Sequence, residues 1–96
     1  MAKRFTAGVV SPARLEVSDE ANIARNWKRF KRDWENYFIA SRLKEETNEA
    51  LKCAVFKTVI GPEAMDMYDG FQFNNPGEEK KLAIVLAKFE EHCEEN

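Results

Sequence analysis

Apolar side chains recur along this chain at the three- and four-residue spacing that is typical of amphipathic helices. The clearest example starts at Ile23, where successive apolar positions are four, three, four and three residues apart. Its members are Ile23, Trp27, Phe30, Trp34, Tyr37 and Phe38. This spacing gathers them on one helix face, so the pattern predicts a helix over about residues 22–42 with an aromatic inner face.

A second helix is expected over about residues 48–60, with Thr47 as its N-cap. It is apolar nearly all round, which predicts a central helix that is packed on both sides. We therefore expect it to be the hub of the core and to touch the other helices through Leu51, Val55, Phe56 and Val59. Gly61 suits the end of this helix, and Pro62 suits the first position of the next one.

Two more helices are predicted, over about residues 62–71 and 78–92, separated by the turn-forming sequence Asn74-Asn75-Pro76-Gly77. A further short helix or turn fits residues 41–46. Residues 1–21 differ, because Gly8, Ser11 and Pro12 interrupt any helix there. This segment predicts an arm with short extended pieces at 9–10 and 15–17, followed by Ser18 or Asp19 as a cap.

The predicted fold class is therefore all-α: a compact bundle of four to five helices, residues 22–96, with an extended N-terminal arm, residues 1–21. The chain of 96 residues corresponds to one domain. Its net charge of −2 does not indicate nucleic acid or a membrane as partner. Both cysteines, Cys53 and Cys93, lie within apolar-periodic stretches, which favours buried, reduced thiols in a cytoplasmic protein.

The sequence does not indicate an enzyme. His92 and Cys93 are adjacent, and adjacent helical residues point about 100° apart, so they do not face each other as a catalytic pair. Zinc sites need about four Cys or His ligands in paired spacings, and the chain holds only 2 cysteines and 1 histidine. The four glycines are too widely spaced for a phosphate-binding loop. We expect no catalytic residues, no metal and no cofactor.

Three segments resemble the Gag capsid domain of gypsy-type long-terminal-repeat retrotransposons. The stretch from Asn26 to Tyr37 resembles its opening helix, and residues 60–64 with the following Tyr68-x-x-Phe71 resemble its second-to-third helix junction. Residues 86–93 are similar to the end of its N-terminal lobe. Together the three segments span about residues 23–93, in the family's order.

The resemblance implies a retroviral-capsid-like helical fold, self-association into virus-like shells and a C-terminal capsid lobe downstream in the parent chain. In host-adopted (domesticated) members of the family, the equivalent lobe looks like a peptide-binding module with a hydrophobic groove. Two functions thus stay open: a structural capsid domain that forms homo-oligomers, and a monomeric adaptor that binds a short linear peptide.

Three groups of residues are candidates for contacts. Aromatic side chains are candidates for a peptide groove, although aromatics at helical spacing more often form a core; they are Trp27, Phe30, Trp34, Tyr37, Tyr68 and Phe71. The arm itself is a candidate to fill such a groove. Ile39 and Ile84 fall outside the predicted inner faces and are candidate assembly contacts.

The third group is a basic face on the first helix, opposite its aromatic face. It consists of Arg25, Lys28, Arg29 and Arg32. Such a face is a candidate to bind polyanions, and the alternative is an ordinary solvated helix surface. The net charge of −2 makes binding of nucleic acid by this fragment the weakest of the three function classes.

Overall fold

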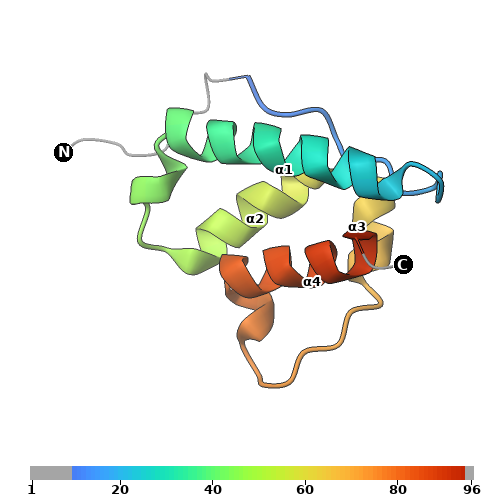
Figure 1. Ribbon diagram of the computed structural model, residues 1–96. Coiled ribbons are helices and arrows are strands. Elements are labelled where there is room, and N and C mark those ends of the chain that lie inside the picture. Colours follow the sequence, from blue (N-terminus) through green and yellow to red (C-terminus); the bar gives the residue numbers. More distant parts are fainter. Residues whose placement is uncertain (1–9, 95–96) are drawn as a thin grey trace.

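The computed structural model describes residues 10–94, and every regular element in this range is a helix (Figure 1). It contains the α-helices α1 (Ile23–Ala40), α2 (Glu49–Ile60), α3 (Pro62–Tyr68) and α4 (Leu82–Glu94). Two short 3₁₀ helices, η1 (Leu43–Glu45) and η2 (Glu78–Lys80), lie in the connections. The predicted class, a small helical bundle with an extended arm, is confirmed.

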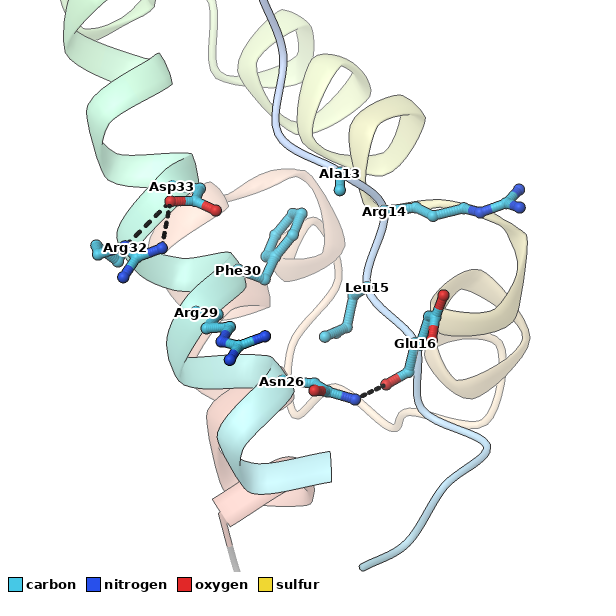
Figure 2. Close-up of a pocket in the computed structure, with 9 residues that line it drawn as sticks. All are labelled: Ala13, Arg14, Leu15, Glu16, Asn26, Arg29, Phe30, Arg32 and Asp33. Atoms are coloured by element: carbon cyan, nitrogen blue, oxygen red, sulfur yellow. Dashed lines mark hydrogen bonds and ion pairs between the residues drawn. The ribbon is translucent and has the colours of Figure 1, made fainter. Parts of the chain in front are cut away.

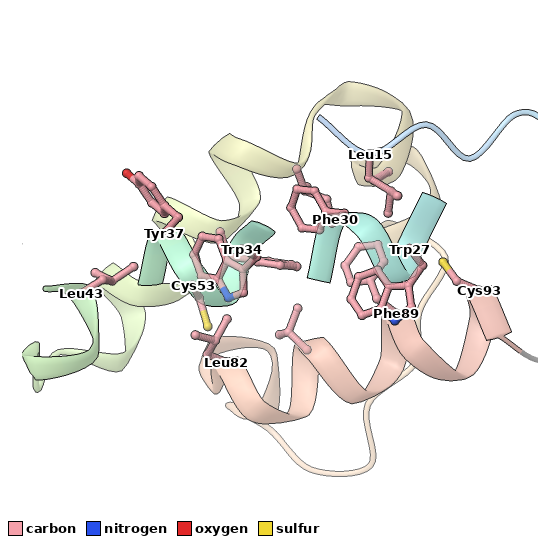
Figure 3. Close-up of a cluster of buried hydrophobic side chains, with 14 residues drawn as sticks. Leu15, Trp27, Phe30, Trp34, Tyr37, Leu43, Cys53, Leu82, Phe89 and Cys93 are labelled. Atoms are coloured by element: carbon pink, nitrogen blue, oxygen red, sulfur yellow. The ribbon is translucent and has the colours of Figure 1, made fainter. Parts of the chain in front are cut away.

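The core is built on aromatic rings from α1, α2 and α4 (Figure 3). The Phe56 ring of α2 packs edge-on against Trp34 at 5.0 Å between centroids and against Phe89 of α4 at 5.7 Å. Trp27 stacks on Phe89 at 6.0 Å. The Trp27, Phe56 and Phe89 side chains are all 0% exposed, so the aromatic face that the periodicity predicts for α1 is the centre of the molecule.

The hub of the core differs from the prediction. Of the four residues expected to make α2 central, only Phe56 is fully buried, whereas Leu51 is 38% exposed. The buried face of α2 consists of Cys53, Phe56 and Ile60. Instead, Phe89 of α4 links α4 to α1 and α3. Its ring contacts the rings of Trp27, Phe56, Tyr68 and Phe71. The pattern of a helix that is apolar nearly all round does not show which face lies deepest. Val55 and Val59 also pack against the core but stay partly buried.

Helix ends differ from the prediction where side-chain caps decide them. The cap of α2 is Asn48 rather than Thr47, because the Asn48 side chain accepts a hydrogen bond from the Leu51 N–H. Neither Ser18 nor Asp19 caps α1, which begins after Asn22. Instead, Asp19 closes a turn in which its carboxylate accepts hydrogen bonds from the N–H of Ala21 and the side chain of Asn22.

Helix α3 ends earlier, and helix α4 begins later, than predicted. Helix α3 ends at Tyr68, and residues 71–73 are irregular. Residues 78–80 form the separate helix η2, and α4 starts at Leu82, whose N–H donates to the Glu49 carboxylate of α2. This long-range bond satisfies an orphan donor at the start of α4, which sequence periodicity does not reveal.

The arm runs in extended form along α1 and then turns back into it (Figure 1). Leu15 is 2% exposed and belongs to the hydrophobic core, so the arm is anchored in the fold at this residue, whereas most of its other described residues are exposed. Residue 9 of the predicted extended piece at 9–10 lies outside the described residues. Among residues 10–94, none of the helices is both long and apolar enough to cross a membrane.

Candidate functional site

The most specific local site is the surface on which the arm lies. The N–H of Leu15 donates to the carbonyl of Ile60 at 2.9 Å. The N–H of Val17 donates to the Glu63 carboxylate at 3.0 Å, and the side chain of Asn26 donates to the carbonyl of Glu16 at 3.2 Å. We use the name arm seat for the surface that receives residues 13–17, namely Asn26, Phe30, Ile60, Gly61 and Glu63.

The bonds of the arm follow from local chemistry. Ile60 is the last residue of α2, so its carbonyl has no partner within that helix, and the Leu15 N–H supplies one. Leu15 and Val17 are two residues apart, and the N–H groups of alternate residues in an extended chain point to the same edge. The arm therefore binds the α2–α3 junction through two N–H groups on one edge, one bonded to a main-chain carbonyl and one to a side-chain carboxylate, with Leu15 as its apolar anchor.

Gly61 makes this close approach possible. Its φ of 93° and ψ of 167° lie in a region that is open essentially to glycine alone. A Cβ atom placed at Gly61 would lie 2.5 Å from the Cβ of Arg14, far inside van der Waals contact. Gly61 thus does more than end α2: it leaves the space that the arm occupies.

The arm leaves open space between itself and α1 (Figure 2). This cleft has a volume of about 640 Å³ and is lined by residues 13–16 of the arm and by Asn26, Arg29, Phe30, Arg32 and Asp33 of α1. Figure 2 shows the Leu15 side chain turned toward α1 and the Arg14 side chain turned away from it. A second hollow of about 350 Å³ lies between residues 10–13 and the later part of α1.

The basic face of α1 is exposed and largely unpaired. Arg32 forms an ion pair with Asp33 at 3.0 Å. Within residues 10–94, Arg25, Lys28 and Arg29 have no ion-pair partner. Arg29 and Arg32 line the cleft beside the arm, so half of the predicted polyanion face borders the arm seat.

The aromatic residues predicted for a peptide groove are mostly interior. Trp27, Phe30, Trp34 and Tyr37 are all 7% exposed or less. Tyr68 and Phe71 are half-buried and reach the others through Phe89. The structure brings the six together as parts of one core; Phe30 also lines the cleft and Tyr37 the second hollow.

The two candidate assembly residues differ in exposure. Ile39, near the end of α1, is 61% exposed, which is high for an isoleucine. Ile84 is half-buried on α4. Leu51 on the outer side of α2 is a second exposed large apolar residue of the helices, although the apolar pattern predicts it to lie in the core. The outer surfaces of α1 and α2 therefore both carry apolar groups that the core does not use.

The titratable groups with shifted pKa values include a lysine–glutamate pair between two helices and the two buried cysteines. Lys31 and Glu90 pair at 2.6 Å across α1 and α4, which raises the pKa of the lysine and lowers the pKa of the carboxyl. The buried indole N–H of Trp27 makes no hydrogen bond, although it lies near enough to Glu90 to contribute to the lower carboxyl pKa. Both cysteines are free and buried. Burial raises the pKa of the thiols, for Cys93 to about 11, so neither is a ready nucleophile.

In the described part of the chain, no three His, Cys, Asp or Glu side chains are grouped so as to hold a metal ion. His92 lies on the surface, with its ring against Phe71 at 4.5 Å between centroids. The groups that the structure does assemble around a cleft are main-chain donors and acceptors, a leucine anchor and cationic side chains. Such groups can hold an extended chain.

The sequence does not predict most of the arm seat. It predicts an extended piece at Leu15–Val17, an arm that could fill an aromatic groove, and Gly61 as a helix terminator. It does not predict that Ile60, Gly61 and Glu63 receive the arm. The alternation of Leu15-Glu16-Val17 was the available signal, since it is the pattern of a strand with one buried side. Which surface receives such a strand depends on contacts across about 45 residues of chain, and a single sequence does not display them.

Comparisons with known proteins give no relative. No protein-family model matches the chain, and neither the curated proteins nor the solved structures contain a significant match to it. Function is therefore argued from the residues and their geometry.

Proposed function

We propose that this chain is a structural domain of the Gag capsid type, which self-associates through weak, repeated surface contacts in the cytoplasm. The observation that carries the proposal is Ile39, a large apolar residue left 61% exposed on the helix whose basic face includes three cations, Arg25, Lys28 and Arg29, without an ion-pair partner among residues 10–94. A domain that assembles needs apolar groups outside its core, and α1 presents one. The family itself enters the proposal through the sequence resemblance over about residues 23–93.

The basic face sets a condition on such assembly. If α1 faces of several copies converge around a symmetry axis, Arg25, Lys28 and Arg29 of each copy concentrate positive charge there. Their mutual repulsion opposes association, and an anion or added salt that screens it favours association. The proposal therefore predicts that salt or a polyanion promotes assembly instead of dissolving it.

Sedimentation velocity over a wide range of protein concentration tests the proposal. We expect the average mass to rise with concentration, and Ile39→Asp to hold the protein at the monomer mass. Ala83→Asp is the matched control, because Ala83 is an exposed apolar residue on α4. A wild-type mass that stays monomeric at every concentration and salt level would refute the proposal.

The alternative is a monomeric adaptor that binds a short linear peptide. The arm seat favours it, because the seat already holds an extended segment through one leucine and main-chain bonds. Calorimetric titration of a Leu15→Asp variant with extended peptides that carry a Leu-x-Val pattern tests this function. Saturable binding by a strictly monomeric protein would support the adaptor over the capsid domain.

A further inference from the structure

We propose that the arm seat is a docking site for the arm of a second copy of this chain, so that neighbouring copies are linked by exchanged arms. The inference deepens the proposed self-association and rests on it for its biological meaning. The segment that docks is residues 13–17, with Leu15 as the buried anchor. The partner is thus a chain of identical sequence, which satisfies each contact of the seat.

The first argument is the composition of the contact. The seat holds the arm by the Leu15 side chain, by two main-chain N–H groups and by one main-chain carbonyl. All of these groups belong to residues 15–17 and need nothing from the rest of the donating molecule. An arm from a neighbour therefore makes the same bonds as the molecule's own arm. Exchange of arms thus requires little free energy beyond that of bringing the two molecules together.

The second argument is the connector between the arm and α1. Residues 18–22 reverse the chain through a turn held by Asp19, whose carbonyl and carboxylate accept bonds from Ala21 and Asn22. The side-chain bonds of this turn are exposed, so water replaces them readily when the turn opens. Five residues of extended chain span up to about 17 Å, which lets an opened arm reach an adjacent molecule.

The third argument is charge. Residues 14–20 carry one arginine against three acidic side chains, a net charge of −2. Arg29 and Arg32 line the cleft beside the arm, and Arg25 and Lys28 extend the same positive surface. Complementary charge brings an incoming arm toward the seat of another copy.

A full-length variant that lacks residues 18–21 tests the docking directly. Without the turn, the arm cannot fold back along its own α1, so it has to seat in another copy or stay free. We expect this variant to form a closed dimer or small ring in sedimentation equilibrium. In NMR on a mixture of ¹⁵N-labelled and ¹³C-labelled chains, we expect contacts between the Leu15 methyl groups of one chain and the Phe30 ring of another.

Two changes within the deletion variant provide matched controls. Leu15→Asp removes the anchor and is expected to weaken the association about tenfold or more, down to monomers in the same concentration range. Val10→Ala changes an arm residue that is 89% exposed, and it is expected to leave the oligomer intact. Circular dichroism of each variant checks that the helices remain folded.

The outcomes separate this inference from the proposed function. A monomeric deletion variant with a free arm, or an oligomer that survives Leu15→Asp, overturns arm docking even if the wild-type chain self-associates. Intermolecular contacts at the seat support arm docking even if the wild-type mass never rises, a result that would refute only the capsid-type proposal. In the wild-type oligomer, purely intramolecular Leu15 contacts would likewise count against exchange.

Discussion

The aromatic core and the arm seat hold the molecule together in opposite ways. In the core, Phe56 and Phe89 are each 0% exposed, and their rings contact rings of several helices. At the arm seat, one leucine is buried, and two of the three hydrogen bonds are exposed. Loss of a core ring therefore affects all the helices at once, whereas the arm can open while the bundle persists.

The largest effect is expected from Phe56→Ala. The substitution removes a ring that packs on Trp34, Phe30 and Phe89 and leaves a cavity, so the free energy of unfolding should fall by ~3–5 kcal/mol. Urea denaturation followed by circular dichroism measures it. Leu51→Ala on the exposed side of the same helix is the control, and an equal loss there would contradict the one-sided burial of α2.

Leu15→Ala is expected to have a smaller effect, of about 2–3 kcal/mol, because only the arm loses its anchor. Hydrogen exchange distinguishes it from a core substitution. The amides of Leu15 and Val17 should lose protection, whereas those in the middle of α1 and α4 should keep theirs. Uniform loss of protection over all helices would show that the arm and the bundle open as one unit.

Gly61→Ala tests the close approach of the arm to the α2–α3 junction. The new Cβ meets Arg14 and also strains the backbone, so we expect a loss of about 1–3 kcal/mol. Gly77→Ala is the comparison variant. Its φ of 92° is also positive, but its ψ of −12° places it in the left-handed helical region, which strains an alanine less than the conformation of Gly61, and its Cβ would have nothing within 4 Å. Thermal unfolding of both variants measures the losses, and an equal or larger loss for Gly77→Ala would contradict a special constraint at Gly61.

The smallest effect is expected at the Lys31–Glu90 pair. The folded protein lowers the pKa of Glu90 and raises that of Lys31. The contribution of Glu90 to stability is therefore present above the ordinary carboxyl pKa and is lost as pH falls through the lowered value. That of Lys31 is lost as pH rises through its raised value. Both side chains are more than a third exposed, so the shifts in melting temperature should be small.

Melting temperatures of wild type and Glu90→Gln between neutral and acid pH measure this contribution. We expect the two curves to converge as the pH falls, because protonation of Glu90 in the wild type removes the same ion pair. Glu91→Gln, on the exposed side of α4, keeps the Lys31–Glu90 pair and should retain the wild-type acid response. A constant difference at all pH values would contradict an electrostatic origin.

The sequence predicted what depends on neighbours along the chain. The aromatic face of α1, the junction at Gly61 and Pro62, and the burial of Cys53 and Cys93 all follow from local spacing and residue type. The prediction was wrong where two caps or two helix faces were equally favourable on local grounds. Thr47 and Asn48 are both good caps, and α2 has two apolar faces, so tertiary contacts made the choice.

The candidate site shows the same division. The amphipathic helices, their order and a non-helical arm are predictable without coordinates, since they depend on periodicity and on the backbone preferences of nearby residues. Three features depend on packing: Leu15 completes the core, Ile60 and Glu63 hold the arm, and Phe89 contacts rings from several segments. Those contacts join residues far apart in the chain, and many pairings satisfy the same pattern until packing selects one.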